Sequence, residues 1–421
     1  MNSLNHEFGW PEAFAHRTAG MAASEIRELL KLLDQDDLIS FAGGIPDPDL
    51  FPTDAIRAAH VTALSGPGGP LSLQYSVSEG HPPLRRWIAG HMHELGVPCD
   101  IDNIAITCGS QQGLDFLGKL LLNKGDTALV TAPTYLGALQ AFSPYEPRYD
   151  TLSLEPRIRV SSRYSDAARP GRIAFAYAVP DFANPTGESL SHEQRLSLLD
   201  LIYDLGVPLI EDGAYSALRY EGQSIKSCLA LDLARRGTLD HSPVIYCGTF
   251  SKTMSPGMRI GWICASRPLI QKLVLAKQAG DLHSSTLSQI VMHEVASTHY
   301  HKQVRKIVSA YRARRDAMLA ALTTHMPPQT TWSHPSGGMF IWLRLPPQMD
   351  GARLLKIAIA KERIAFVPGA AFYADGSNPN TIRLAFALQS ETAIREGIRR
   401  LGSLIAEYGV LPEDRLLSAE L

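Results

Sequence analysis

The chain has 421 residues, enough for a large core and for two or three domains. Its 40 basic and 42 acidic side chains give a net charge of −2, so it lacks the basic excess that draws proteins to nucleic acid or anionic lipid. No apolar run approaches the ~18 residues of a membrane span, and the first ten residues do not form a signal peptide. We therefore expect a cytoplasmic protein with small-molecule partners.

The five cysteines are scattered, odd in number and without a C-x-x-C pair. This pattern predicts reduced cysteines of a cytosolic protein, because disulfide frameworks and zinc sites need paired spacing. Two histidine pairs, His91 with His93 and His299 with His301, are two residues apart. On a helix such residues point in different directions, and no third ligand completes a site, so we predict no metal.

The N-terminal part predicts a helix and then a constrained loop. Residues 22–33 have the apolar spacing of an amphipathic helix. Residues 39–52 contain the pair Gly43 and Gly44 and closely spaced prolines, which suits either a plain connector or a loop that brings backbone close to a ligand. Farther on, Tyr75 precedes another helix and, taken alone, fits a core position equally well.

Two short strands are each predicted to end in a turn, the first in a glycine turn and the second in a proline turn. Residues 103–117 predict a strand, a glycine turn and a helix that begins near Gly109, Ser110 and Gln111. The first N–H groups of a helix are unpaired and its dipole is positive there, so this turn is a candidate phosphate site, although Ser110 could be only a helix cap. Tyr135 ends the next strand, where it could stack on a flat ring or lie in the core.

Polar residues also end the next strands. Residues 173–187 predict a strand with an N-P-T-G turn that contains Asn184, and a capped helix follows over residues 191–206. The next strand ends at Asp212, with Tyr215 three residues later. A carboxylate there could keep a pyridine nitrogen protonated, and a simple helix cap is the alternative.

Lys252 follows a β-rich run that begins at Val244. The hydroxyls of Thr249 and Ser251 precede it, and Arg259 lies seven positions later. A lysine amine beside phosphate-seeking groups suits an imine with a phosphorylated aldehyde, which indicates pyridoxal 5′-phosphate (PLP). A solvated surface lysine is the alternative, because lysines are commonly exposed.

The C-terminal part changes to short strands after a largely helical stretch. Helical patterns occur over residues 287–295 and 304–322, and the last strand carries Arg383, followed by an amphipathic helix over residues 391–408. The planar guanidinium of Arg383 matches a carboxylate, and a salt-bridged strand arginine is the alternative. Alternation of strands and helices over about residues 55–310 predicts an α/β fold, with a mainly parallel sheet covered by helices and a smaller α+β domain.

Six segments together carry a family resemblance: FAGGIP, QYSVSEG, GSQQGLD, FANPTG, SKTMSPGMRIGW and VPGAAFYADG. They resemble the class I and II aminotransferases of fold type I, and within them the α-aminoadipate/kynurenine subgroup. The resemblance covers nearly the whole chain. It implies an N-terminal segment over residues 1–50, a large PLP-binding domain over residues 51–310, a small domain over residues 311–421, and a homodimer with shared active sites.

The resemblance also implies site roles. Lys252 forms the Schiff base and moves the proton, Asp212 faces the ring nitrogen, Asn184 and Tyr215 bond the phenolic oxygen, and Tyr135 stacks on the ring. The residues implied for the phosphate are Ser110, Gln111, Thr249, Ser251, Arg259 and Tyr75 of the neighbouring subunit. The residues implied for the substrate are Arg383, Asn184, Gly44 and Arg17.

The expected reaction moves the amino group of an L-amino acid, of aminoadipate, aromatic or aliphatic type, to a 2-oxo acid such as 2-oxoglutarate. The same cofactor and fold also support β-elimination, decarboxylation and racemisation. A non-catalytic, effector-binding regulator is a further alternative. It is disfavoured because such regulators carry a winged helix-turn-helix first, and only about 20 residues precede the first predicted helix.

Overall fold

The fold is organised around a seven-stranded sheet. A computed structural model describes residues 9–21, 37–153 and 171–408. The strand order is β2-β8-β7-β6-β5-β3-β4, and β8 alone runs antiparallel to its neighbours within this sheet. The strands are β2 (Ile104–Thr107), β3 (Thr127–Val130), β4 (Arg148–Thr151), β5 (Ile173–Ala178), β6 (Leu209–Asp212), β7 (Val244–Thr249) and β8 (Gly261–Cys264). The mainly parallel sheet predicted from the sequence is confirmed.

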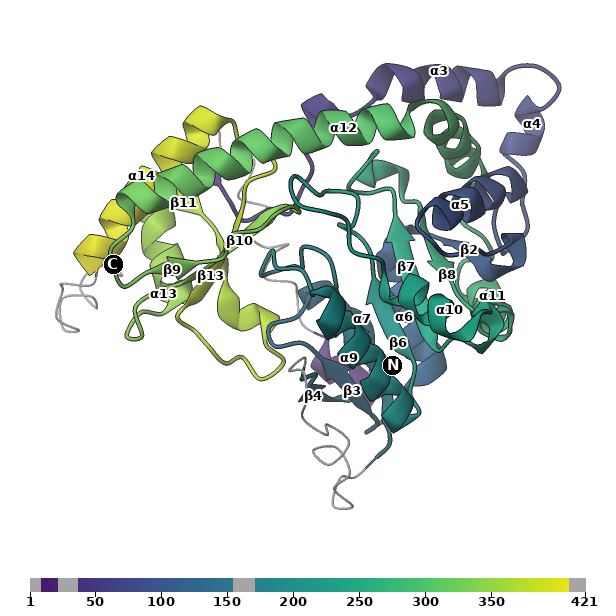
Figure 1. Cartoon of the computed structure of the whole chain (residues 1–421), viewed down its shortest axis with the longest axis horizontal. Helices are drawn as coiled ribbons and strands as arrows, with labels where there is room; N and C mark the ends of the chain where they lie inside the picture. The colour runs from purple at the N-terminus through teal and green to yellow at the C-terminus, as the bar shows by residue number, and fades with distance from the viewer. Residues whose placement is uncertain (1–8, 22–36, 154–170, 409–421) are drawn as a thin grey trace, which may run out of the picture.

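Helices cover both faces of this sheet because its strands are apolar on both sides (Figure 1). Along β7, Ile245 and Cys247 belong to one buried cluster, and Val244 and Tyr246 to the other, as the two-residue period of a strand requires. The first cluster includes α6 (Gly109–Leu121), α7 (Leu136–Phe142) and α11 (Arg267–Gly280). The second includes α5 (Pro82–Glu94), α9 (His192–Leu205) and α10 (Cys228–Arg236).

The ends of α9 illustrate how local sequence fixes an element. The Ser191 side chain accepts from the backbone N–H of Gln194, and the Gln194 side chain accepts from the N–H of Ser191, which forms a capping box. At the other end Gly206 has φ 65°, the left-handed conformation that glycine adopts without strain. The helix predicted over residues 191–206 is confirmed.

A smaller lobe is built on a four-stranded antiparallel sheet in the order β12-β13-β10-β9. Its strands are β9 (Thr331–Trp332), β10 (Phe340–Arg344), β12 (Val367–Pro368) and β13 (Thr381–Ala385), and its helices include α13 (Gly351–Ile357) and α14 (Glu391–Tyr408). The N-terminal strand β1 (Ile39–Ser40) pairs in parallel with β11 (Ile364–Ala365). The N-terminal segment is thereby attached to this lobe.

One long helix, α12 (Thr286–His325), connects the two lobes. It packs on α3 (Thr53–Leu64) and α5 at one end and on α14 at the other (Figure 1). The sequence predicts helical patterns over residues 287–295 and 304–322, and the structure joins them into one helix of 40 residues. The polar stretch between them contains neither glycine nor proline, so nothing interrupts the backbone hydrogen bonds.

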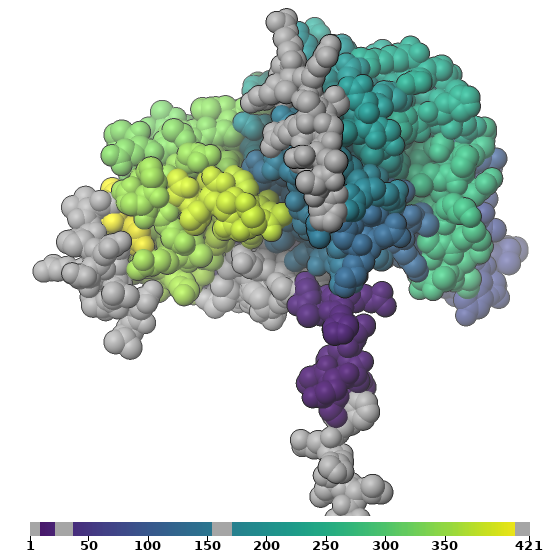
Figure 2. Space-filling view, turned by 90° about the horizontal axis from the view of Figure 1, so that it is seen from below, coloured from purple at the N-terminus to yellow at the C-terminus, as the bar shows by residue number. Residues whose placement is uncertain are grey.

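Residues 9–21 stand out from the body of the molecule and contain α1 (Trp10–Ala13) (Figure 2). The helix predicted at residues 22–33 lies outside the described residues. Among the helices that the structure does describe, none has the length and apolar character needed to cross a bilayer.

A buried ion pair braces the loop that carries Asn184. The side chain of Arg195 is fully buried, and its guanidinium donates to both carboxylate oxygens of Asp181 at 2.7 and 3.2 Å. It also donates to the carbonyls of Pro180, Leu190 and Lys226. Because every arm of the guanidinium is bonded, the pair fixes the path of the chain on both sides of the loop.

We expect Asp181→Ala to lower the free energy of unfolding by about 3–5 kcal/mol, since it leaves a buried guanidinium without its counter-charge. Urea unfolding of the apoprotein measures this loss. The matched control is Asp54→Ala, which removes an exposed pair with Arg57 (2.8 Å, side chains 94% and 70% exposed) and should cost at most about 1 kcal/mol. Equal losses from the two variants would contradict the bracing role.

Candidate active site

A cavity lies where β5, β6 and β7 end and α6 begins. Its lining residues are Ser110, Gln111, Tyr135, Val179, Asp212, Ala214, Tyr215, Thr249, Ser251, Lys252, Pro256 and Arg259. Nine of these twelve are residues that the sequence predicts for the cofactor site. They come together because parallel strands end at the same edge of a sheet, although they are up to 149 positions apart in the chain (259 − 110).

Lys252 lies just beyond the end of β7, with its side chain partly buried. Its Nζ donates to the carbonyl of Gly44 at 3.0 Å, so the glycine loop predicted to approach a ligand does reach this lysine. Desolvation by the surrounding protein, with the positive charges of Arg383 and Arg259, lowers the pKa of Lys252 to about 8. About a tenth of the amine is therefore neutral at pH 7, far more than for a lysine with its ordinary pKa.

Asp212 is the last residue of β6 and is buried. Its Oδ2 accepts from the hydroxyl of Tyr177 at 2.9 Å, and its Oδ1 accepts from the N–H of Ala214 at 3.2 Å. Burial raises the pKa of Asp212 to about 6, while these two hydrogen bonds and the charge of Lys252 act in the opposite direction. Two neutral donors thus hold the carboxylate at the edge of the cavity.

Arg383, on β13, is 1% exposed and has no carboxylate partner among the described residues. Its Nη1 donates to Oδ1 of Asn184 at 2.8 Å and its Nη2 to the carbonyl of Ala42 at 2.6 Å, while its buried Nε has no partner. Burial lowers the pKa of Arg383 to about 10. A buried cation with a free donor indicates that an anion completes this site.

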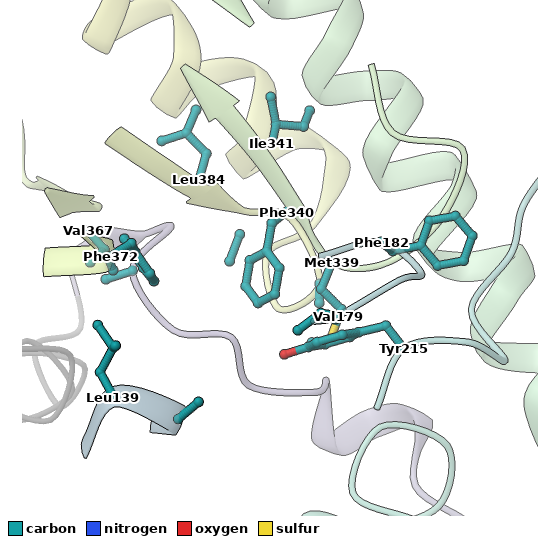
Figure 3. Packing of buried hydrophobic residues seen from close by; sticks show 14 of the residues in the cluster. Leu139, Val179, Phe182, Tyr215, Met339, Phe340, Ile341, Val367, Phe372 and Leu384 are labelled. Atoms are coloured by element: carbon teal, nitrogen blue, oxygen red, sulfur yellow. The ribbon is translucent and has the colours of Figure 1, made fainter. Parts of the chain in front are cut away.

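Two aromatic rings hold this guanidinium. It lies 4.4 Å from the ring centroid of Phe340 and 5.0 Å from that of Phe372, and cation–π attraction offsets part of the cost of burying it. Figure 3 shows Phe340 beside Tyr215, whose rings meet edge to face with centroids 5.7 Å apart. The Tyr215 hydroxyl in turn accepts from Nδ2 of Asn184 at 3.4 Å.

The other end of the cavity fits a phosphate. The first turn of α6 contributes backbone N–H groups and the side chains of Ser110 and Gln111, and β7 contributes the hydroxyl of Thr249, which donates to Ser251 Oγ at 2.9 Å. Arg259 adds a positive charge, held by its bond from Nη2 to the Cys108 carbonyl at 3.1 Å. Cations, hydroxyls and a helix N-terminus together are the donors that a phosphate dianion requires.

Glycine is necessary for this close approach. Gly109 has φ +73°, and a Cβ placed on it would lie 2.4 Å from Nη2 of Arg259. A Cβ on Gly261 would lie 2.6 Å from the backbone nitrogen of Ser110. Both positions must lack a side chain for Arg259 and β8 to pack against the start of α6.

Two predicted residues lie away from this cavity. Arg17 is exposed in the 3-10 helix His16–Gly20, which contacts the 3-10 helix Ser143–Tyr145. Tyr75 is 78% exposed, and its ring lies 5.8 Å from that of His283. The predicted role of Tyr75 involves a neighbouring subunit and that of Arg17 is a substrate-side cation, and both remain predictions.

Sequence reasoning did not identify Tyr177, Phe340 or Phe372. Each is an aromatic residue within an apolar run, which is also the pattern of an ordinary core position. Only Tyr177 offered a signal in the sequence, because its polar hydroxyl lies in an otherwise apolar strand just before the N-P-T-G turn. Within the described part of the chain, no three His, Cys, Asp or Glu side chains are grouped to hold a metal ion.

Comparison with known proteins agrees with this geometry. The aromatic-amino-acid aminotransferase 1 of Thermococcus litoralis is 40% identical over 401 residues, 94% of each chain. The 2-aminoadipate transaminase of Thermus thermophilus is 38% identical over 393 residues, 93% of this chain and 96% of its own. The crystal structure of the α-aminoadipate aminotransferase of Thermus thermophilus, complexed with N-(5′-phosphopyridoxyl)-L-leucine, superposes with a TM-score of 0.85 at 35% identity, covering 98% of this chain and all of that one.

The cofactor of this chain is PLP, and the cavity offers a phosphate cradle, a carboxylate and a lysine amine in the arrangement that PLP needs. The family model for aminotransferase class I and II matches residues 37–401. With this match and relatives of up to 40% identity along nearly its full length, the chain belongs to the class I and II aminotransferases.

Proposed function

We propose that this aminotransferase takes the amino group of an L-amino acid of aminoadipate, aromatic or aliphatic type and passes it to a 2-oxo acid such as 2-oxoglutarate. The observation that carries the proposal is the buried guanidinium of Arg383, whose Nε lacks a partner, in the site that also holds Lys252. The named substrates of the two relatives, aromatic amino acids and 2-aminoadipate, support the range of donors.

In this proposal Lys252 has two tasks. Its amine would hold PLP covalently in the resting enzyme and, once freed, would accept the proton from the substrate Cα. Bound PLP supplies the electron sink for the Cα electrons. The lowered pKa of Lys252 suits both tasks, because the neutral amine is the nucleophile and the base.

Arg383, Asn184 and Gly44 form the substrate side of the proposed site. Arg383 binds the α-carboxylate through its planar donor edge, and the rings of Phe340 and Phe372 keep that edge oriented. Asn184 already accepts from Arg383, so it sets the position of the guanidinium before substrate arrives. Arg17 is proposed as a second cation on the substrate side.

The remaining residues are proposed to hold PLP. Asp212 would hold the ring nitrogen, Tyr135 would stack on the ring, and Asn184 and Tyr215 would donate to the phenolic oxygen. The groups proposed for the phosphate are Ser110, Gln111, Thr249, Ser251, Arg259 and Tyr75 of the partner subunit.

We propose a homodimer with shared active sites. A run of exposed apolar side chains supports this assembly, since a patch of this kind on a monomer marks an interaction surface. Its members, on α3, α4 (Gly69–Ser72) and the segment that follows, are Val61, Leu64, Leu71, Leu73, Tyr75 and Val77.

Two further proposals concern organisation and location. The division into residues 1–50, 51–310 and 311–421 is supported by the separate seven-stranded and four-stranded sheets, with α12 crossing the second boundary.

We also propose a cytoplasmic location. All five cysteines are free, and a reducing compartment keeps cysteines in this state.

The first test is the product. The holoenzyme, supplied with 2-aminoadipate, phenylalanine or leucine and 2-oxoglutarate, should release the donor's 2-oxo acid and glutamate in equal amounts. Lys252→Ala should abolish turnover, because it removes the covalent link and general acid–base catalysis worth ~10²–10⁴-fold. Lys272→Ala, at an exposed position on α11, is the matched control and should keep full activity. Release of ammonia or carbon dioxide, or activity in Lys252→Ala, would reject the proposal.

The second test uses pH. The rate constant for PLP capture by the apoprotein should rise about tenfold per pH unit below pH 8 and level off above about pH 9, because the neutral amine of Lys252 dominates there. Stopped-flow absorbance measures this rate. A rate still rising steeply between pH 9 and 10 would show an unperturbed lysine and contradict the lowered pKa.

The third test addresses the shared site. Tyr75→Phe should raise the dissociation constant of PLP by about tenfold or more, the value of one hydrogen bond to a charged group. Mixed dimers of Tyr75→Phe and Lys252→Ala chains should regain one site with normal affinity, since the Lys252→Ala chain donates an intact Tyr75 across the interface. If the mixed dimers gain no such site, Tyr75 does not act across subunits.

A further inference from the structure

A buried tyrosine hydroxyl is the side-chain partner of Asp212. Tyr177 lies on β5, the strand next to β6, and is 0% exposed. Its ring packs edge to face on Phe142, with centroids 5.9 Å apart, within the apolar cluster between the sheet and α7. Its hydroxyl donates to Oδ2 of Asp212 at 2.9 Å.

The direction of this hydrogen bond follows from the surroundings. Burial, with the nearby charge of Asp212, raises the pKa of Tyr177 far above its ordinary value, so the phenol keeps its proton and acts as the donor. A buried hydroxyl without a partner would destabilise the fold, so Tyr177 and Asp212 satisfy each other. The apolar packing of the ring gives the hydroxyl little freedom to turn away.

We propose that Tyr177 is a positioning residue that keeps the Asp212 carboxylate ionised and aimed at the ring nitrogen of PLP. This inference rests on the role of Asp212 proposed above. Tyr177 engages one carboxylate oxygen and the Ala214 N–H engages the other, which fixes the plane of the group. An ionised carboxylate has about four acceptor positions, so the remaining ones are available toward the cavity.

The hydrogen bond from Tyr177 matters because the pKa of Asp212 is close to neutral pH, so that a further rise would neutralise the carboxylate. Burial already raises its pKa to about 6, and a hydrogen bond to the charged form opposes that rise. Other titratable groups that face Asp212 are Lys252 and Cys247 on the β7 side and Tyr215 after β6. Removing the Tyr177 hydroxyl should raise the pKa of Asp212 by about one unit, so that the carboxyl is neutral over more of the range from pH 6 to 7.

The test compares two ligands in Tyr177→Phe and in the unaltered protein. One is PLP, and the other is its analogue in which C–H replaces the ring nitrogen. Equilibrium binding to the apoprotein is measured from pH 6 to pH 9. We expect the variant to bind PLP about threefold more weakly near pH 6.5, because a one-unit rise of the pKa lowers the ionised fraction of Asp212 by about that factor, with a smaller loss at pH 9, where Asp212 is ionised in both proteins. Binding of the analogue should be unchanged, since it has no ring nitrogen for Asp212 to hold.

The matched control is Tyr246→Phe. Tyr246 is another buried phenol, on β7, but its hydroxyl lies 3.3 Å from Ser216 Oγ, and its ring belongs to the buried cluster on the other face of the sheet from Tyr177. This control should bind PLP with the pH profile of the unaltered protein. If Tyr177→Phe loses affinity for both ligands equally, or loses the same amount at every pH, its role is structural and the inference is wrong. Failure of the unaltered protein to bind PLP, or an unchanged rate of capture in Lys252→Ala, would instead reject the proposed function.

Discussion

The buried guanidinium of Arg383 is the group on which the arrangement of the site depends. It comes from β13 of the small lobe, donates to Asn184 of the large lobe, and donates to the Ala42 carbonyl in the N-terminal segment. Three distant parts of the chain therefore meet at one charge. Burying that charge is costly, and the rings of Phe340 and Phe372 offset part of the cost. The fold itself thus holds a buried cation where the two lobes and the N-terminal segment meet.

The same physical cause acts on the two other charged groups of the site, with opposite results. Desolvation lowers the pKa of Lys252 and raises that of Asp212, so both groups are brought closer to neutrality by the protein around them. A pyridinium ring would favour the ionised form of Asp212, and a neutral amine is what an aldehyde requires. Burial thus brings the pKa values of Lys252 and Asp212 toward neutral pH, and hydrogen bonds to Asp212 limit the size of its shift.

Much of the fold and site could be predicted from the sequence because the signals are local. Asp212 is the last residue of one buried strand, Lys252 lies just beyond another, and the caps of α9 are fixed by Ser191 and Gly206. Other features have no local signal. Tyr177 looks like a core residue until the neighbouring strand is placed beside it, and the role proposed for Tyr75 involves a second subunit. The continuity of α12 depended on the absence of helix breakers, which is a weaker signal than the presence of a cap.

The length of α12 has a mechanical consequence. At 1.5 Å per residue its 40 residues form a rod about 60 Å long, and each lobe packs on a different part of it. The two lobes are therefore connected by a continuous helix and not by a flexible linker. Any movement of the small lobe relative to the large one must therefore bend this helix or shift its packing on α3, α5 or α14.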